Sequence, residues 1–395
     1  MPKYSDYGKL HDRLVRKAVR KRHPIHAVFE LTYRCNFSCR HCYIPYTEVD
    51  REKSSDSQPS CPGVSHGAKE IGTKEVFKIL DELALNGCFN VGFTGGEPLV
   101  RRDIFDILEY SKKKGFNIIL LTNGSLITPA KAAKLKRLAL NKIDISFHSF
   151  REEQFDWFVR TPGAYKKVIK AIELVSVIGT PFYFKTAAMT INKDDMVKIR
   201  RLAVEKYGAR FRWVPWLTPR WDGTKDNLEF RLEPKAVVEI KKAISDDAEA
   251  EYEKVSPLQK RGAPTKRKSP GRRKIVNSVF NCNAGRTDVV INPYGEMKLC
   301  MDLPEPKYSI LKGNFAEGWR MLGDYAEGMA PGPTYRCHEC DLFRFCDVCP
   351  ARSYLECGDL NACPPYHRKL AEFTKELLEK DIHYDFQKAK VESRR

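Results

Sequence analysis

The sequence lacks any long apolar stretch. It contains no run of eighteen or more apolar residues, and the opening "MPKYSDYGKL" has none of the apolar core of a secretory signal. These absences argue against a membrane-spanning helix and against export. We therefore expect a cytoplasmic protein with no membrane partner.

The cysteines do not suit a framework of disulfide bonds. There are thirteen of them, an odd number, in 395 residues, and the cytosol keeps thiols reduced. Metal ligation or redox chemistry is the better interpretation. The length, together with 42% hydrophobic residues, allows one large α/β domain with a smaller module beside it.

Positive charge is in excess, at a formal net charge of +18. Much of it lies in two segments, residues 13–23 and 259–274. An acidic peptide, an anionic cofactor or nucleic acid could be attracted to them, although an exposed arm and an exposed linker are the simpler interpretation. Aromatic residues do not alternate with the charges, which makes nucleic acid the weakest candidate.

Apolar strands and amphipathic helices alternate from residue 26 to 215. The expected strands are 26–32, 88–94, 117–122, 142–148, 182–188 and 209–215. Thr73 and Thr128 are expected to cap helices, with Pro129 in the first turn of the second one and Gly87 just past the end of the first. This alternation predicts an α/β fold with a parallel sheet, whose active site lies at the carboxyl ends of the strands.

Two loose segments interrupt the pattern. Residues 46–70 are polar and rich in Ser and Pro, so we expect a flexible insertion in which Cys61 and His66 would hold ligands poorly. Residues 245–278 form the second loose segment. The expected domains are a basic arm (1–25), a core barrel (26–215), a connecting segment with a basic linker (216–278), a cysteine-rich domain (279–370) and a C-terminal helix and tail (371–395).

Three cysteines share one short loop after the first strand. Cys35, Cys39 and Cys42 lie in "LTYRCNFSCRHCYIP", and three such thiolates can hold three irons of a cubane cluster while the fourth iron stays open. A zinc site would need a fourth ligand, and His41 between two of the cysteines closes a tetrahedron awkwardly. The spacing indicates an iron–sulfur cluster.

A glycine pair follows the second strand. "TGGEP" places Gly95, Gly96, Glu97 and Pro98 at the strand end. The glycines let a ligand approach the backbone, and the glutamate adds a negative charge, which suits an amino group better than a phosphate. Thr122 and Asn123 after the third strand are weaker candidates, since Asn-Gly is first of all a turn signal.

In these two motifs, and in their order along the strands, the sequence resembles the radical S-adenosylmethionine (SAM) superfamily. The resemblance implies a partial (β/α)6 barrel, similar to a TIM barrel, over residues 26–215. It also implies that SAM chelates the open iron of a [4Fe-4S] cluster through its amino and carboxylate groups, and that the GGEP segment receives the amino group. One electron, from a donor such as flavodoxin or ferredoxin, would cleave SAM to a 5′-deoxyadenosyl radical that abstracts hydrogen from a substrate.

Two more residues are candidates for contact with SAM. On the fourth strand Asp144, Ser146 and His148 alternate with apolar residues and should face the barrel lumen. The resemblance places a polar residue near the SAM ribose, for which Ser146 is the candidate, and a hydrogen bond within the barrel is the alternative. Lys185 stands among aromatic residues, where a charge needs a partner such as the SAM carboxylate. A structural ion pair or a surface lysine would also explain it.

A second set of cysteines follows residue 279. Two CxxC pairs alone would predict a zinc ribbon, but after such a core they resemble a SPASM domain with one or two auxiliary [4Fe-4S] clusters. By that resemblance we expect Cys282, Cys300 and Cys349 around one cluster, with an open or non-cysteine fourth position. The other would be held by Cys337, Cys340 and Cys346, and Cys363, Cys357 or His367 could supply its last ligand. Cys88 is better explained as a small buried residue.

Three functions remain open at this point. The first is a SPASM-type maturase, an oxidoreductase that modifies a ribosomally made peptide or protein. No leader-binding domain is visible before residue 26, so a separate protein could deliver the peptide. The second is the same chemistry on a small anionic metabolite, a tetrapyrrole or pterin precursor. The third, a zinc-stabilised nucleic-acid-binding protein, leaves the GGEP strand unexplained.

Overall fold

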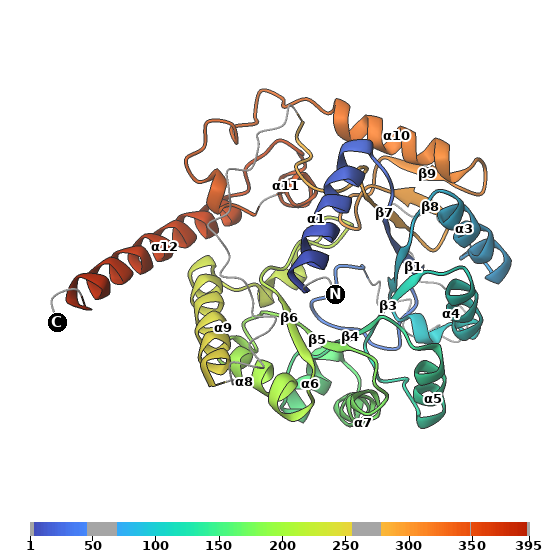
Figure 1. The fold of residues 1–395 in the computed structure, drawn as a ribbon, viewed down its shortest axis with the longest axis horizontal. Helices are drawn as coiled ribbons and strands as arrows, with labels where there is room; N and C mark the ends of the chain where they lie inside the picture. Colours follow the sequence, from blue (N-terminus) through green and yellow to red (C-terminus); the bar gives the residue numbers. More distant parts are fainter. Residues whose placement is uncertain (1–3, 46–68, 255–277, 348, 393–395) are drawn as a thin grey trace.

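The structure is a computed structural model that describes residues 4–45, 69–254, 278–347 and 349–392 (Figure 1). Cys61, His66 and most of both loose segments lie outside these residues. In Figure 1 a curved sheet surrounds the centre of the molecule and helices form its outer layer. The predicted α/β fold with a partial barrel is confirmed.

Six parallel strands form the barrel wall. They are β1 (His26–Thr32), β2 (Asn90–Gly95), β3 (Asn117–Thr122), β4 (Lys142–Ser146), β5 (Phe182–Ala187) and β6 (Arg210–Val214). They lie side by side in sequence order from β1 to β6, and each pairs in parallel with the next. The fourth strand ends at Ser146, two residues before the expected boundary. All six carboxyl ends therefore meet at one rim.

Helices connect the strands across the outer face of the sheet. They are α3 (Thr73–Leu85), α4 (Ile104–Lys113), α5 (Pro129–Leu138), α6 (Glu152–Val159), α7 (Ala164–Ser176) and α8 (Met196–Arg201), with a π-helical turn at Leu202–Lys206 and short 3-10 turns at Pro98–Val100, Lys193–Asp195 and Asp226–Phe230. Thr128 caps α5 as predicted, because its side chain accepts a hydrogen bond from the amide of Lys131. Thr73 does not cap α3: it is the first helical residue, and its hydroxyl donates to Asp103 at 2.7 Å.

The main core lies between the sheet and these helices. Ile143, Ile145 and Phe147 of the fourth strand segment are fully buried in it. The residues between them, Asp144 and Ser146, face the other way, toward a cavity inside the barrel. The alternation expected from the sequence is therefore present, and it separates the packing face from the lumen.

The cysteine-rich region extends the same sheet. β7 (Asp288–Ile291) pairs in parallel with β1, and β8 (Glu296–Lys298) and β9 (Lys307–Ser309) follow in antiparallel order. α10 (Phe315–Gly328), a 3-10 turn at Phe343–Phe345 and α11 (Pro350–Cys357) complete the region. The second cysteine set is thus anchored to the first strand of the barrel. The domain boundaries expected from the sequence stay a prediction.

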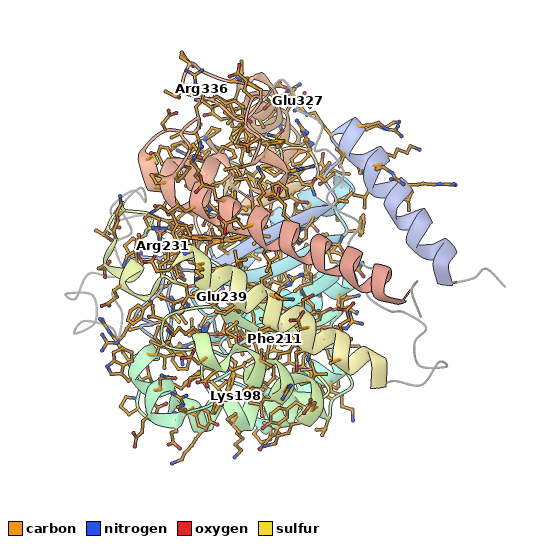
Figure 2. All side chains as sticks on the ribbon, turned by 90° about the vertical axis from the view of Figure 1, so that its left-hand side faces the viewer. Lys198, Phe211, Arg231, Glu239, Glu327 and Arg336 are labelled. Carbon is orange, nitrogen blue, oxygen red and sulfur yellow. The ribbon has the colours of Figure 1, made fainter. Side chains whose placement is uncertain are left out.

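Two long helices and one basic helix lie outside the barrel. α9 (Pro234–Lys254) and α12 (Pro365–Glu392) pack together through Val237, Ile240 and Leu370, and they run side by side in Figure 2. α1 (Tyr4–Lys21) stands at the edge of the molecule in the same view. The described chain contains no helix that is both long enough and apolar enough to cross a membrane.

A buried ion pair ties β1 to β8. Glu30 is fully buried, and its Oε2 lies 3.6 Å from Nζ of Lys298 and accepts a hydrogen bond of 3.0 Å from the hydroxyl of Tyr33. Burial raises the pKa of Glu30, and the neighbouring Lys298 opposes that rise. The pair stabilises the junction only as long as both charges are present.

We predict that Lys298→Ala costs about 3–5 kcal/mol of unfolding free energy, because it leaves the carboxylate of Glu30 buried without a cation. Urea unfolding of the two proteins measures the cost. The double variant Glu30→Leu/Lys298→Met should recover most of it, and Lys114→Ala, which breaks an exposed pair with Asp81, should change little. A double variant as unstable as Lys298→Ala would contradict the prediction.

Candidate functional site

The rim of the barrel encloses a cavity of about 330 Å³. Every strand of the barrel wall, or the loop that follows it, contributes to its lining. Several residues that the sequence marked as site candidates line this cavity: Cys35, Cys39, Cys42, Gly95, Gly96, Ser146 and Lys185. Asn123, Asp144, His148, Trp216, Leu217, Thr218, Met301 and Asp302 also face it. The structure thus gathers residues from seven separate segments around one space.

The glycine pair is required by a close backbone approach. Gly95 has φ of 126°, and a Cβ there would lie 2.1 Å from the carbonyl oxygen of Thr32. A Cβ on Gly96 would lie 2.4 Å from the carbonyl oxygen of Arg34. The amide of Gly96 donates to Thr32 at 2.7 Å. Any other residue would push the strand end away from the cysteine loop.

Glu97 turns away from the cavity. Its carboxylate is fully buried and accepts hydrogen bonds from the amides of Leu99 and Asn123 and from the hydroxyl of Thr122, at 3.0, 2.6 and 2.7 Å. Neither Glu97 nor Pro98 lines the cavity. The carboxylate therefore holds two strand ends together, and the turn presents the backbone of Gly95 and Gly96 to a ligand.

Asn123 is a site residue that the sequence analysis ranked too low. Its Nδ2 lies 3.9 Å from Sγ of Cys35 and donates to Oδ1 of Asn36 at 3.0 Å. The amide of Phe37 lies 3.4 Å from the same sulfur. These donors stabilise a thiolate at Cys35. In the sequence, Asn123 followed by Gly124 is typical of a turn and gives no sign of contact with a cysteine. Its position directly after a barrel strand does indicate a place at the site.

Lys185 and Ser146 lie opposite each other on neighbouring strands. Burial lowers the pKa of Lys185, and the carboxylate of Asp144 opposes that effect. Asp144 itself pairs with Lys142 at 3.1 Å, and among the described residues no carboxylate lies within ion-pair distance of Lys185. The cavity therefore contains a cation that suits an anionic group of a ligand. Contact of Lys185 and Ser146 with SAM stays a prediction.

Aromatic rings close one side of the cavity. His41 stacks on Phe158 at 4.8 Å between ring centroids and meets His148 edge-on at 4.7 Å. Burial lowers the pKa of His148 to about 4, and the charge of Lys185 adds to the effect. Burial also keeps His41 neutral, by lowering its pKa well below the usual value. This wall is neutral near pH 7 and excludes water.

The three thiols fit a cluster better than a single metal ion. Burial raises the pKa of Cys35 to about 12 and that of Cys39 well above its usual value, and the neighbouring thiols add to both effects. Three thiolates here therefore require a cationic partner. In the described parts of the chain no three His, Cys, Asp or Glu side chains are placed to hold one metal ion together. A cubane cluster distributes its thiolates over separate irons, as this arrangement allows.

A second cavity, of about 780 Å³, lies beside the first. Cys282, Cys337, Cys346 and Cys349 line it. Burial raises the pKa of Cys300 to about 12, and the thiols of Cys349 and Cys282 add to the rise. These three cysteines, expected to share one cluster, are therefore close enough to interact. The ligand assignment itself stays a prediction.

Cys337 and Cys340, which are expected around the other cluster, lie near Cys363, and the ligand assignment of that cluster also stays a prediction. Burial raises the pKa of Cys337, and the thiols of Cys363 and Cys340 add to that rise. Cys363 interacts in turn with Cys340 and Cys357. Cys363 is therefore well placed to supply a last ligand beside Cys337 and Cys340. Cys346 faces the same cavity as Cys337.

His367 lies in a different environment from these thiols. It is 2% exposed, its Nδ1 has no hydrogen-bond partner among the described residues, and its ring lies against Trp216 and Tyr366. Burial lowers its pKa to about 3, and the charges of Arg352 and Arg231 add to the effect. Cys88, by contrast, is buried at the base of β2, where its thiol donates to the carbonyl of Asn90.

His367 should make the folded state sensitive to acid. In the unfolded chain the imidazole of His367 is protonated near its ordinary pKa of 6.5. In the folded chain its pKa is about 3, so the imidazole stays neutral until the pH approaches that value. The contribution of the neutral His367 to the unfolding free energy is therefore fully present above pH 6.5 and is lost as the pH falls. Between pH 7.5 and 5.5 we predict that His367→Phe loses about 1.4 kcal/mol less than the wild type in urea unfolding.

The exposed His338 provides the control for this prediction. His338→Gln should leave the pH dependence unchanged. Iron content should be the same in all three proteins if His367 is not a metal ligand. An unchanged pH dependence in His367→Phe, or a loss of iron, would contradict this account of the residue.

Comparison with known proteins agrees with this geometry. The sequence model of the Radical SAM superfamily matches residues 29–203. An AdoMet-dependent heme synthase of Methanosarcina barkeri is 27% identical over 86% of this chain and 94% of its own length. The mycofactocin maturase MftC of Mycolicibacterium smegmatis is 28% identical over 82% of this chain and 77% of its own. The subtilosin biosynthesis protein AlbA of Bacillus subtilis is 29% identical over 71% of this chain, which spans only 56% of AlbA.

Solved structures show the same fold at low identity. SuiB of Streptococcus suis bound to S-adenosylmethionine superposes with a TM-score of 0.63 at 14% identity, over 93% of this chain and 84% of that one. Native anSMEcpe with bound AdoMet and Cp18Cys peptide gives 0.65 at 15% identity, over 91% and 99%. Together with the three-cysteine loop and the glycine pair, these matches identify residues 29–203 as a radical SAM domain of an enzyme, and the second cysteine set resembles a SPASM domain.

Proposed function

We propose that this protein is a peptide maturase that modifies side chains of a ribosomally made peptide or protein. As a radical SAM enzyme it uses S-adenosylmethionine and a [4Fe-4S] cluster, and SPASM-type enzymes also carry auxiliary clusters. The observation that carries the proposal is the pair of adjoining cavities, one at the three-cysteine loop and one lined by the second cysteine set, with Trp216 in the wall of both. Relatives named as a maturase and as a bacteriocin biosynthesis protein support it.

Bound SAM and its cluster supply the 5′-deoxyadenosyl radical, and the residues of the chain prepare the site for it. Cys35, Cys39 and Cys42 would hold the cluster. Lys185 would bind the carboxylate of SAM, and the backbone of Gly95 and Gly96 would meet its amino group. The remaining wall keeps water away from the reacting atoms.

Ser146 would lie near the ribose of SAM, since it occupies the cavity beside Lys185. Its hydroxyl can donate to or accept from a ribose hydroxyl. The rings of His41, His148 and Phe158 near this part of the cavity carry no charge. Lys185 is then the charged hydrogen-bond donor available there. Such a surface orients SAM without offering a proton near neutral pH.

The larger cavity has room for a substrate segment beside the clusters. It lies between the end of β6, helices α9 and α12 and the cysteine-rich region. Trp213, Trp216 and Tyr335 give it apolar surface, and Lys241 and Arg352, against the one carboxylate of Asp347, give it an excess of positive charge. An acidic peptide suits such a lining. SuiB is also known bound to its precursor peptide SuiA.

Two further partners belong to this proposal. A small electron carrier such as flavodoxin or ferredoxin would reduce the cluster, and a separate protein could deliver the peptide leader. None of the described cysteines forms a disulfide bond, which suits the reducing cytoplasm as the place of action.

A tetrapyrrole substrate is the second candidate. The heme synthase of Methanosarcina barkeri aligns with this chain over nearly all of its own length. The positive groups of both cavities would then bind carboxylate side chains of the macrocycle. In this case a small molecule, not a peptide, would fill the space next to the second cysteine set.

We predict that Cys35→Ala/Cys39→Ala/Cys42→Ala removes one cluster and all reductive cleavage of SAM. Iron and sulfide analysis, electron paramagnetic resonance and the yield of 5′-deoxyadenosine measure these effects on anaerobically reconstituted protein. The auxiliary clusters should persist in the variant. Continued reductive cleavage of SAM would refute the assignment of the three-cysteine loop.

The substrate class is tested with the same anaerobic protein, SAM and reductant. Candidate peptides encoded beside the gene are examined for a change in mass, and a tetrapyrrole with propionate side chains is examined in a parallel reaction. We expect a peptide to change mass in proportion to the 5′-deoxyadenosine formed, and the triple cysteine variant to leave it unchanged. Conversion of the tetrapyrrole instead would overturn the maturase proposal in favour of the second candidate.

A further inference from the structure

The backbone of the three-cysteine loop is held by a turn far away in the sequence. This turn, residues 216–230, follows β6 and lies against the loop. Four successive carbonyl groups of the loop accept hydrogen bonds from it. The carbonyls of Arg40 and Cys42 accept from Arg220, that of His41 from Nδ2 of Asn227 and that of Tyr43 from the amide of Trp221.

Arg220 is the centre of this contact. Its Nη1 donates to the carbonyl of Cys42, and its Nη2 donates to the carbonyl of Arg40 at 3.2 Å. Its Nε and Nη2 also bind the two carboxylate oxygens of Asp226, at 2.8 and 2.9 Å. The residue is 9% exposed. A planar guanidinium can satisfy these acceptors together, and an ammonium group cannot.

The opposite side of the loop is held by the barrel. The amides of Ser38 and Arg40 donate to the carbonyls of Val159 and Phe158 at the end of α6, at 3.1 and 3.0 Å. The loop is therefore fixed from both sides, through its amides by α6 and through its carbonyls by the turn. Of these two supports, the turn is the one that contacts the carbonyl of Cys42, a cysteine expected to hold iron.

Arg220 also places a positive charge at the loop. The guanidinium interacts electrostatically with the thiol of Cys42. Its carboxylate partner, Asp226, is 68% exposed, so solvent screens that negative charge more than the buried positive one. A cation near a cluster favours the added electron, and charge and hydrogen bonding around the sulfurs set cluster potentials.

The same turn forms part of the cavity wall. Trp216, Leu217 and Thr218 line the cavity just before Arg220 in the chain. The loop that would carry the cluster and the wall that would meet the substrate are therefore parts of one hydrogen-bonded unit. Arg220 contributes two of the hydrogen bonds that join them.

We propose that Arg220 is a positioning residue for the SAM-binding cluster. The two terminal nitrogens of its guanidinium fork bind the carbonyls on either side of His41 and thereby orient Cys42. Its positive charge raises the reduction potential of the cluster. The inference rests on the three-cysteine loop as the cluster site. It does not depend on which substrate the enzyme takes, so its failure would leave the maturase proposal untouched.

Two variants separate the two effects. Arg220→Lys retains the charge and loses the fork, and Arg220→Gln loses both. Each full-length protein is reconstituted anaerobically, and the SAM-binding cluster is followed by redox titration and electron paramagnetic resonance. The spectrum of Cys35→Ala/Cys39→Ala/Cys42→Ala is subtracted to remove the auxiliary clusters. None of these measurements requires turnover.

We expect both variants to alter the spectrum of the reduced cluster and its response to added SAM. In Arg220→Gln the ratio of reduced to oxidised cluster at a fixed potential should fall about tenfold, a midpoint shift of about 59 mV to lower potential for a one-electron couple. In Arg220→Lys the midpoint should stay close to that of the wild type. Loss of the SAM-binding cluster from a folded Arg220→Gln protein, judged by circular dichroism, would also support the proposal.

Arg231 provides the matched control, and Figure 2 marks its place below the base of α12. It also pairs with a carboxylate, that of Glu356, and donates to a carbonyl of the turn, that of Leu217 at 3.3 Å. It is buried to a similar extent, with 14% of its side chain exposed against 10% for Arg220. No contact with the three-cysteine loop is present for it among the described residues.

Arg231→Lys and Arg231→Gln should lower the unfolding temperature without changing the potential or spectrum of the SAM-binding cluster. If the Arg220 variants match the wild type in both properties, the proposal is wrong. It is equally wrong if the Arg231 variants shift them by the same amount, because the effect would then come from general loosening of the turn.

Discussion

The partial burial of three thiols on the loop after β1 is the constraint on which the site depends. Away from water a thiolate is costly, and Cys35 and Cys39 have pKa values raised by burial. Iron would offset the charge of the thiolates, but the surrounding protein must still hold the loop in place. Asn123 and the amide of Phe37 direct hydrogen-bond donors at Cys35. Arg220 brings a positive charge to Cys42, at the other end of the loop.

The sheet links the position of the three-cysteine loop to the second half of the chain. Because β7 pairs with β1, the cysteine-rich region continues the strand that leads into the three-cysteine loop. The buried pair of Glu30 and Lys298 then joins β1 to β8, two residues before Cys300. A change in the position of β1 would therefore move both cysteine sets. Two sites that would hold cofactors at a fixed separation are thus built on neighbouring strands of one sheet.

Much of this arrangement could be predicted from local patterns. The strand alternation, the spacing of Cys35, Cys39 and Cys42 and the cap at Thr128 each depend on a few adjacent residues. Glu97 could not be placed in this way, because its three donors come from its own turn and from the end of another strand. Arg220 was missed for the same reason, since its acceptors on the loop are about 180 residues away in the sequence. Periodicity and spacing report local structure, and a long-range hydrogen bond leaves no such signal.

Trp216 shows how the two cavities are related. Its side chain contributes to the lining of both, and the guanidinium of Arg352 lies 3.8 Å from the centre of its ring. Arg352 belongs to α11, which begins directly after Cys349. One stacked pair thus separates the space proposed for SAM from the space lined by the second cysteine set. Because a single indole lies in both walls, a substrate radical formed on one side would be close to an electron acceptor held on the other. A short distance is what transfer of an electron from such a radical requires.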